Sequence, residues 1–119
     1  MAYDEAVAGR VRKALAKYPG FVEKKMFGGL ALMLNGHMCC GVIGNELMVR
    51  VGPKAYVASL CRPHTREMDF TGRPLTGFVY VAPEGFAAAA SLRAWVGRGA
   101  GFALSLPPRP ARARKRRAR

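Results

Sequence analysis

The sequence predicts an α+β domain with an N-terminal helix, a five-stranded, mostly antiparallel sheet and a C-terminal helix. Apolar residues recur at helical spacing near both ends of the chain, and short apolar runs separated by turn residues fill the middle. A chain of 119 residues is long enough for one hydrophobic core and too short for two ordinary ones. We therefore expect one domain over residues 1–106, followed by a tail over residues 107–119.

The first predicted element is an amphipathic helix over residues 4–18. Val7, Val11 and Leu15 follow one another at intervals of four residues, which places them on one face of a helix. Asp4 precedes this pattern and is a residue type that caps helix N-termini, while the Pro-Gly pair at residues 19–20 ends the helix.

The next elements are a strand over residues 21–27 and a β-hairpin. Asn35-Gly36 lies between two apolar runs, which is the strongest short-range pattern of a hairpin with a two-residue turn. Such a turn fixes the register by pairing residues across it: Leu34 with His37, Met33 with Met38, Leu32 with Cys39 and Ala31 with Cys40. Both faces of this hairpin are apolar, so we expect it to be central and covered on both sides by a helix or a partner subunit.

The second half of the chain supplies the remaining elements. We expect a strand over residues 46–51 and a short helix over residues 53–61 that starts at a proline. Residues 62–77 have no periodicity and many turn residues, which predicts a long loop. A fifth strand over residues 77–82 follows, and then a helix from residue 83 whose far end three glycines weaken.

The stretch His-Met-Cys-Cys-Gly places metal-ligating side chains close together in the sequence. On a regular strand Cys39 and Cys40 point to opposite faces and cannot bind one metal ion together. A zinc site made of His37, Cys39 and either Cys61 or His64 is the alternative, although no CxxC or HxxxH spacing supports it. We interpret the two cysteines as small apolar residues inside a packed sheet, and we expect neither a metal nor a cofactor.

The predicted loop contains a second group of reactive side chains. His64 lies near Glu67 and Asp69 in the sequence, and a histidine beside a carboxylate could serve as a general base. No nucleophile or oxyanion pattern accompanies them, and a loop of mixed charge is more often a set of solvated ion pairs. An enzyme or metal protein using His37, Cys39, His64 and Asp69 is therefore the least favoured hypothesis, and we expect the protein not to be an enzyme.

Positive charge is unevenly distributed along the chain. The net charge is +13, and seven of the twenty lysines and arginines fall in residues 109–119, which hold no acidic residue. We predict that this tail contacts nucleic acid without sequence preference, because it can neutralise phosphates but has no ordered element to read bases. The predicted contact residues are Arg109, Arg112, Arg114, Lys115, Arg116, Arg117 and Arg119. A second group, Arg10, Arg12, Lys13 and Lys17 with Lys24 and Lys25, forms either a basic binding face or an ordinary solvated surface.

The sequence has no stretch of about 18 uncharged apolar residues, and its first residues lack the apolar core of a secretory signal. Three cysteines in a short chain favour reduced thiols over a disulfide framework. We therefore expect a cytoplasmic protein with no membrane partner.

Several motifs resemble the TfoX/Sxy N-terminal domain family over about residues 3 to 105. The resemblance rests on the Met-Phe-Gly-Gly motif at residues 26–29, the segment over residues 68–74 that leads into residues 77–81, and the tryptophan of the last helix. It implies a helix, a five-stranded antiparallel sheet and a closing helix, similar to type III secretion chaperone-like folds. We interpret the motif residues as structural: Met26, Phe27, Gly28, Gly29, Met68, Asp69, Phe70, Gly72, Arg73, Pro74 and Trp95.

The resemblance also implies a function. Family members with an added C-terminal domain regulate natural competence as co-activators beside a DNA-bound transcription factor, and here a basic tail stands where that domain would begin. We expect a non-enzymatic regulatory domain of transcription that associates with DNA or with a DNA-bound protein such as a transcription factor, alone or as a homodimer. The alternative is a chaperone-like protein-interaction module with no direct role at nucleic acid.

Overall fold

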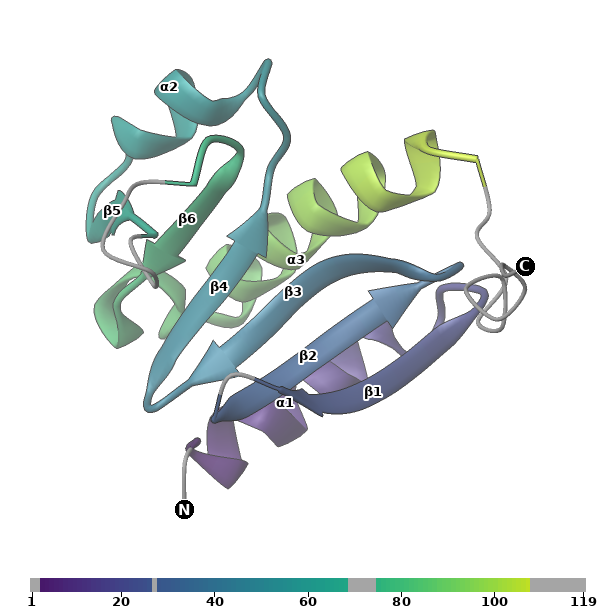
Figure 1. Cartoon of the computed structure of the whole chain (residues 1–119). Coiled ribbons are helices and arrows are strands. Elements are labelled where there is room, and N and C mark those ends of the chain that lie inside the picture. The colour runs from purple at the N-terminus through teal and green to yellow at the C-terminus, as the bar shows by residue number, and fades with distance from the viewer. Residues whose placement is uncertain (1–2, 27, 69–74, 108–119) are drawn as a thin grey trace.

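Helices precede and follow a block of strands in the chain (Figure 1). The computed structural model describes residues 3–26, 28–68 and 75–107. Its elements are α1 (Glu5–Leu15), β1 (Phe21–Met26), β2 (Gly29–Leu34), β3 (His37–Ile43), β4 (Glu46–Arg50), α2 (Tyr56–Leu60), β5 (Thr65–Glu67), β6 (Phe78–Val81), the 3₁₀ helix η1 (Pro83–Phe86) and α3 (Ala89–Ser105). This order confirms the predicted α+β class.

The described strands form one antiparallel sheet in the order β1-β2-β3-β4-β6-β5. Within the described residues the sheet has six strands, so the predicted count of five was wrong by one. The additional strand, β5, lies inside the segment that we predicted as a loop and pairs with β6 at the edge of the sheet. Three residues are too few to show a period of two, so only the partner strand reveals this element.

The helix α1 begins where the sequence predicts. Oδ1 of Asp4 accepts hydrogen bonds from the N–H groups of Ala6 at 2.8 Å and Val7 at 3.3 Å, which satisfies two donors that have no partner inside the helix. Val7, Val11 and Leu15 are buried in the main core, as their spacing predicts. The helix ends at Leu15, three residues before the predicted end.

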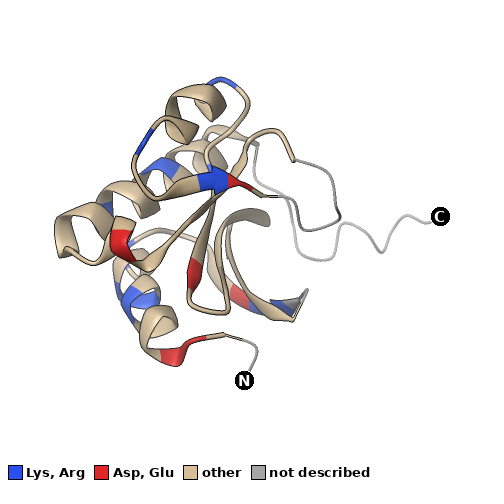
Figure 2. Ribbon diagram, turned by 90° about the vertical axis from the view of Figure 1, so that its left-hand side faces the viewer, with Lys and Arg blue, Asp and Glu red and all other residues tan. Residues whose placement is uncertain are grey.

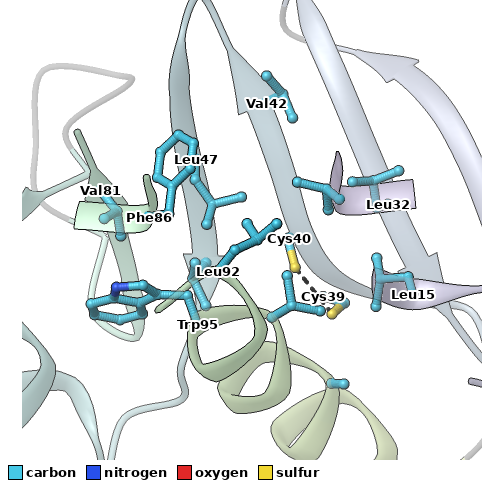
Figure 3. Close-up of a cluster of buried hydrophobic side chains, with 14 of the residues drawn as sticks. Leu15, Leu32, Cys39, Cys40, Val42, Leu47, Val81, Phe86, Leu92 and Trp95 are labelled. Carbon is cyan, nitrogen blue, oxygen red and sulfur yellow. Dashed lines mark hydrogen bonds between the residues drawn. The ribbon is translucent and has the colours of Figure 1, made fainter. Parts of the chain in front are cut away.

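The helices α1 and α3 lie on the same face of the sheet, and the main core fills the space between these layers (Figures 1 and 3). The strands contribute mostly alternate residues, as a pleated sheet requires. These are Leu30, Leu32, Leu34, Val42, Leu47, Val49, Val79 and Val81, and the helices add Val11, Leu15, Leu92, Trp95 and Val96. Each large apolar side chain removed from water contributes about 1.5–3 kcal/mol, so this layer is the main source of stability.

The opposite face of the sheet carries a second, smaller apolar cluster. Met48, Met68 and Tyr80 are buried there, and Met38, Ile43 and Phe78 are partly buried against them. Met48 lies between two β4 residues of the main core, so successive side chains of this strand enter the two clusters in turn. Both faces of the central strands are therefore apolar, as the sequence predicts.

The turn between β2 and β3 is the predicted one. Asn35 and Gly36 have φ angles of 52° and 84°, the left-handed backbone that a two-residue hairpin turn of this type needs. The first pairs beyond the turn also match the prediction, with Leu34 opposite His37 and Met33 opposite Met38.

Beyond these pairs, a bulge shifts the register away from the predicted one. Leu32 faces Cys40 instead of Cys39, and Ala31 faces Gly41 instead of Cys40. Two residues of β3 therefore oppose one residue of β2, which interrupts the alternation of faces. Both cysteines reach the main core, so the prediction that they point to opposite faces was wrong. Every residue of β3 after its histidine is apolar or glycine, so the hydrophobic pattern is the same whether or not the register shifts by one position.

The later helices start further along the chain than predicted. The helix α2 starts at Tyr56 rather than Pro53, and η1 occupies the start of the segment that we predicted as one helix with α3. The helix α3 runs through all three glycines that we expected to weaken it. A Cβ on Gly99 would lie 2.5 Å from the carbonyl oxygen of Cys39, so the missing side chain allows α3 to approach β3 closely.

Candidate functional site

The predicted nucleic-acid contacts share one part of the chain. They are Arg109, Arg112, Arg114, Lys115, Arg116, Arg117 and Arg119, and all seven lie outside the described residues. Six residues of the family motifs lie outside them as well: Phe27, Asp69, Phe70, Gly72, Arg73 and Pro74. The geometry of the site is therefore built from the body of the domain.

The described motif residues occupy positions in the sheet, its turns and its cores. Met26 is the last residue of β1, Gly28 has a φ of 72° in the following turn, and Gly29 begins β2. Met68 is buried in the second cluster and Trp95 in the main core. The structural interpretation of the motifs stays a prediction.

Three segments meet at the end of the sheet formed by the β2–β3 hairpin. Nε2 of His37 donates a hydrogen bond to the carbonyl oxygen of Pro107 at 2.6 Å, which ties the residues after α3 to the β2–β3 hairpin. The N–H of Asn35 donates to the carbonyl oxygen of Gly20 at 3.2 Å, which brings the α1–β1 turn to the same place. Pro107, the last described residue, therefore lies beside the β2–β3 hairpin, and Lys17 is exposed between α1 and β1.

Two arginines of the predicted basic face are engaged within the fold. Arg12 forms ion pairs with Glu23 at 2.6 Å and Glu5 at 3.1 Å, and the hydrogen bonds to these two carboxylates raise its pKa. Arg10 donates to the carbonyl oxygen of Phe86 at 2.9 Å and thereby links α1 to η1. Both side chains cross-link elements of the body, so neither is freely available to a ligand.

The other members of that predicted face, Lys13, Lys17, Lys24 and Lys25, are exposed. Figure 2 shows that the lysines and arginines of the body are spread over several elements, with acidic residues among them. This dispersed pattern is typical of an ordinary solvated surface.

The Cys39–Cys40 pair lies in the main core against α3 (Figure 3). Both side chains are fully buried, and their sulfur atoms share a hydrogen bond at 3.3 Å. This hydrogen bond and burial raise the pKa of Cys40 well above its ordinary value, so the thiol stays protonated. Cys61 is exposed elsewhere, and no group of three or more His, Cys, Asp or Glu side chains in the described residues could hold a metal ion.

The hypothesis of a general base in the 62–77 segment gains no support from its geometry. Within the described part of the chain, the ring of His64 forms no hydrogen bond to a carboxylate, and Asp69 lies outside it. Arg66 pairs instead with Glu46 of β4. What distinguishes His64 is its backbone, because its φ of 62° is a left-handed conformation that few residues other than glycine adopt.

A cleft of about 310 Å³ opens beside His64, between the α2–β5 turn, η1 and α3. Its lining residues are Arg62, Pro63, His64, Glu84, Gly85, Ser91, Ala94, Trp95 and Arg98. His64 and Trp95 stand out separately in the sequence, but nothing there marks Arg62 and Arg98 as their partners. The local signal was the spacing of Ser91, Trp95 and Arg98 along one helix face, but only the folded chain brings the turn of Arg62 to that face.

The two arginines make this cleft electropositive. The guanidinium of Arg98 lies over the ring of Trp95, 4.6 Å from its centroid. Burial, and then the neighbouring positive charge of Arg62, lower the pKa of Arg98. Among the described residues neither arginine forms an ion pair, although Glu84 lies in the same lining.

Comparisons with known proteins give one positive result. The family model described as the TfoX N-terminal domain matches residues 13–103. No curated protein and no solved structure matches the chain. In the described part of the chain, no helix combines the length and apolar character needed to cross a membrane.

Proposed function

Because the chain belongs to the TfoX N-terminal domain family, we propose that it is a non-enzymatic regulatory domain that acts in transcription by associating with DNA or a DNA-bound protein. In this proposal the folded body presents a protein-binding or dimerising surface. The basic tail supplies a nonspecific anchor on phosphates.

The observation that carries the proposal is the concentration of charge at the end of the chain. Residues 109–119 hold seven basic and no acidic side chains, whereas the rest of the chain holds thirteen basic and seven acidic ones. A protein that neutralises Z phosphates of duplex DNA binds with a slope of log affinity against log salt of about −0.9Z. Seven contacts would therefore give a slope of about −6.

The origin of the tail also supports the proposal. Pro107 is hydrogen-bonded to His37, so the last described residue before the basic segment lies beside the hairpin. A duplex held by the tail would therefore meet this end of the sheet first.

The test measures binding of the full chain to random duplex DNA over a series of salt concentrations. In the main variant, serine replaces the seven basic residues of the tail; in the control variant, glutamine replaces Lys13, Lys17, Lys24 and Lys25. We expect the tail variant to lose most of the salt slope and the control to keep it. An unchanged slope in the tail variant would contradict the anchor, and weak binding by the unmodified chain would direct the search to a DNA-bound protein.

The alternative, a chaperone-like interaction module, gains less from the structure. The large apolar side chains exposed in the described residues are Val22, Val57 and Leu75, from three separate parts of the chain. A protein-binding surface of that kind is expected to present a contiguous apolar patch. Nothing in these three positions favours the alternative over the nucleic-acid proposal.

A further inference from the structure

We propose that the cleft between the α2–β5 turn, η1 and α3 binds a dianionic phosphate, either free or as the terminal group of a small phosphate monoester, through Arg62 and Arg98. This site is separate from the basic tail and goes beyond the proposed function. The argument rests on the charge of the cleft, the fixed positions of its donors and its size.

The positive charge of the cleft favours the binding of an anion. Two other arginines of the body have carboxylate partners, Arg12 with Glu23 and Arg66 with Glu46. Arg62 and Arg98 instead influence each other, and like charges at close range repel. Burial lowers the pKa of Arg98 most, and the positive charge of Arg62 lowers it further. A bound dianion would remove the repulsion, whereas the single carboxylate in the lining, on Glu84, forms no ion pair with either arginine in the described residues.

The donor from α3 is held in place before any ligand arrives. The guanidinium of Arg98 is stacked on Trp95 at 4.6 Å, and the indole itself is only 4 % exposed. Stacking fixes the plane of a guanidinium and leaves its N–H groups at the edge available for hydrogen bonds. Ser91 lies on the same face of the helix, seven residues earlier, and adds a hydroxyl donor to the lining.

The opposite wall is a rigid turn. The carbonyl oxygen of His64 accepts from the N–H of Ala82 at 2.8 Å, and Oγ1 of Thr65 donates to the carbonyl oxygen of Pro63 at 3.1 Å. A Cβ on Gly85 would lie 3.2 Å from the Cβ of His64, so η1 packs tightly against this turn. The left-handed backbone of His64 is strained for a residue other than glycine, and such strain is concentrated at functional sites.

The size and donors of the cleft favour phosphate over other anions. A volume of about 310 Å³ is at the lower end of the range for ligand sites, so it suits a small group rather than a folded partner. Two guanidinium groups and a hydroxyl offer many N–H and O–H donors, which match the several acceptor oxygens of a phosphate. A carboxylate has two oxygens and a single charge, and one arginine is sufficient to bind it.

The chain provides its own probe for this site. Trp95 is the only tryptophan and lies under Arg98, so an anion that moves or neutralises Arg98 changes its fluorescence. The full chain is titrated with inorganic phosphate and with glycerol phosphate, at constant ionic strength set by chloride, and calorimetry measures the same binding independently. We expect saturable binding of at least one of these two probes. Binding of both would indicate a monoester site, and binding of inorganic phosphate alone would indicate a site for the free ion.

Variants separate the cleft from the rest of the surface. Arg62→Gln and Arg98→Lys should each weaken binding by roughly tenfold or more, because a charge-assisted hydrogen bond contributes about 1.5–3 kcal/mol. Arg93→Gln is the matched control, since this arginine is exposed on the same helix and does not line the cleft. The variant with a serine tail should bind as well as the unmodified chain.

Four results would overturn the proposal. The first is no saturable response to either phosphate probe. The second is binding of acetate as tight as that of phosphate, which would mean that the cleft does not select a dianion. The third is equal affinity in Arg62→Gln and Arg93→Gln. A fluorescence change caused by duplex DNA alone would likewise exclude a small-ligand site and assign the cleft to nucleic acid.

Discussion

Replacing Gly99 with alanine tests how closely α3 packs on the sheet. The new Cβ would lie 2.5 Å from the carbonyl oxygen of Cys39 and 3.2 Å from its sulfur. The first contact is with backbone, so the helix or the strand must move to relieve it. Overpacking a core in this way costs about 1–3 kcal/mol, while alanine is the better helix former by about 1 kcal/mol.

Gly97 provides a matched control in the same helix. A Cβ there has nothing within 4 Å, so alanine at this position should gain helix propensity without a clash. We therefore expect the Gly99→Ala variant to be less stable than Gly97→Ala by about 1–3 kcal/mol. The free energy of unfolding is measured by urea denaturation, with circular dichroism and Trp95 fluorescence as two probes of one transition. Equal stability of the two variants would mean that α3 does not approach β3 as closely as described.

Three further predictions concern the N-terminal cap and the thiols. Asp4→Ala should lower the free energy of unfolding by about 1 kcal/mol, because two N–H groups of α1 lose their acceptor. Urea denaturation measures this change, and an unchanged midpoint would mean that Asp4 does not stabilise the start of α1. A thiol reagent should label Cys61 rapidly in the folded chain and reach Cys39 and Cys40 only after denaturant is added, which mass spectrometry can follow. The pKa of Cys40 is raised above the ordinary value of 9.0, so the folded state retains this proton longer than the unfolded chain. Its contribution to the free energy of unfolding is therefore present below about pH 9 and is lost above it, at up to about 1.4 kcal/mol per pH unit. In urea melts at pH 8 to 10, the free energy of unfolding of the Cys40→Ala variant should fall less steeply with pH than that of the unmodified chain.

The local features of the fold could be predicted from the residues that form them. Asp4 caps α1 through N–H groups two and three positions away, and the Asn35-Gly36 turn needs only two residues that accept a left-handed backbone. The spacing of Val7, Val11 and Leu15 likewise marks one helix face without reference to any partner. Each of these signals acts within a few positions of the chain.

The bulge at the cysteine pair and the strand β5 could not be predicted in this way. The register of β3 changes inside an apolar run, where either alignment buries apolar side chains, so packing against β2 and α3 decides between them. The strand β5 has three residues and exists because β6 offers it a free edge. In both cases the deciding contact comes from a distant part of the sequence.

The sequence by itself determined the α+β class, the capped first helix, the central hairpin turn and the concentration of charge in the tail, because each depends on composition or on neighbours a few residues apart. The tertiary structure decided that Cys39 and Cys40 share one core, that α3 approaches β3 closely at Gly99, and that Arg62 and Arg98 line one cleft. Each of these features depends on contacts between residues far apart in the chain. Such contacts are determined by the close packing of the folded interior, and no local pattern in the sequence predicts them.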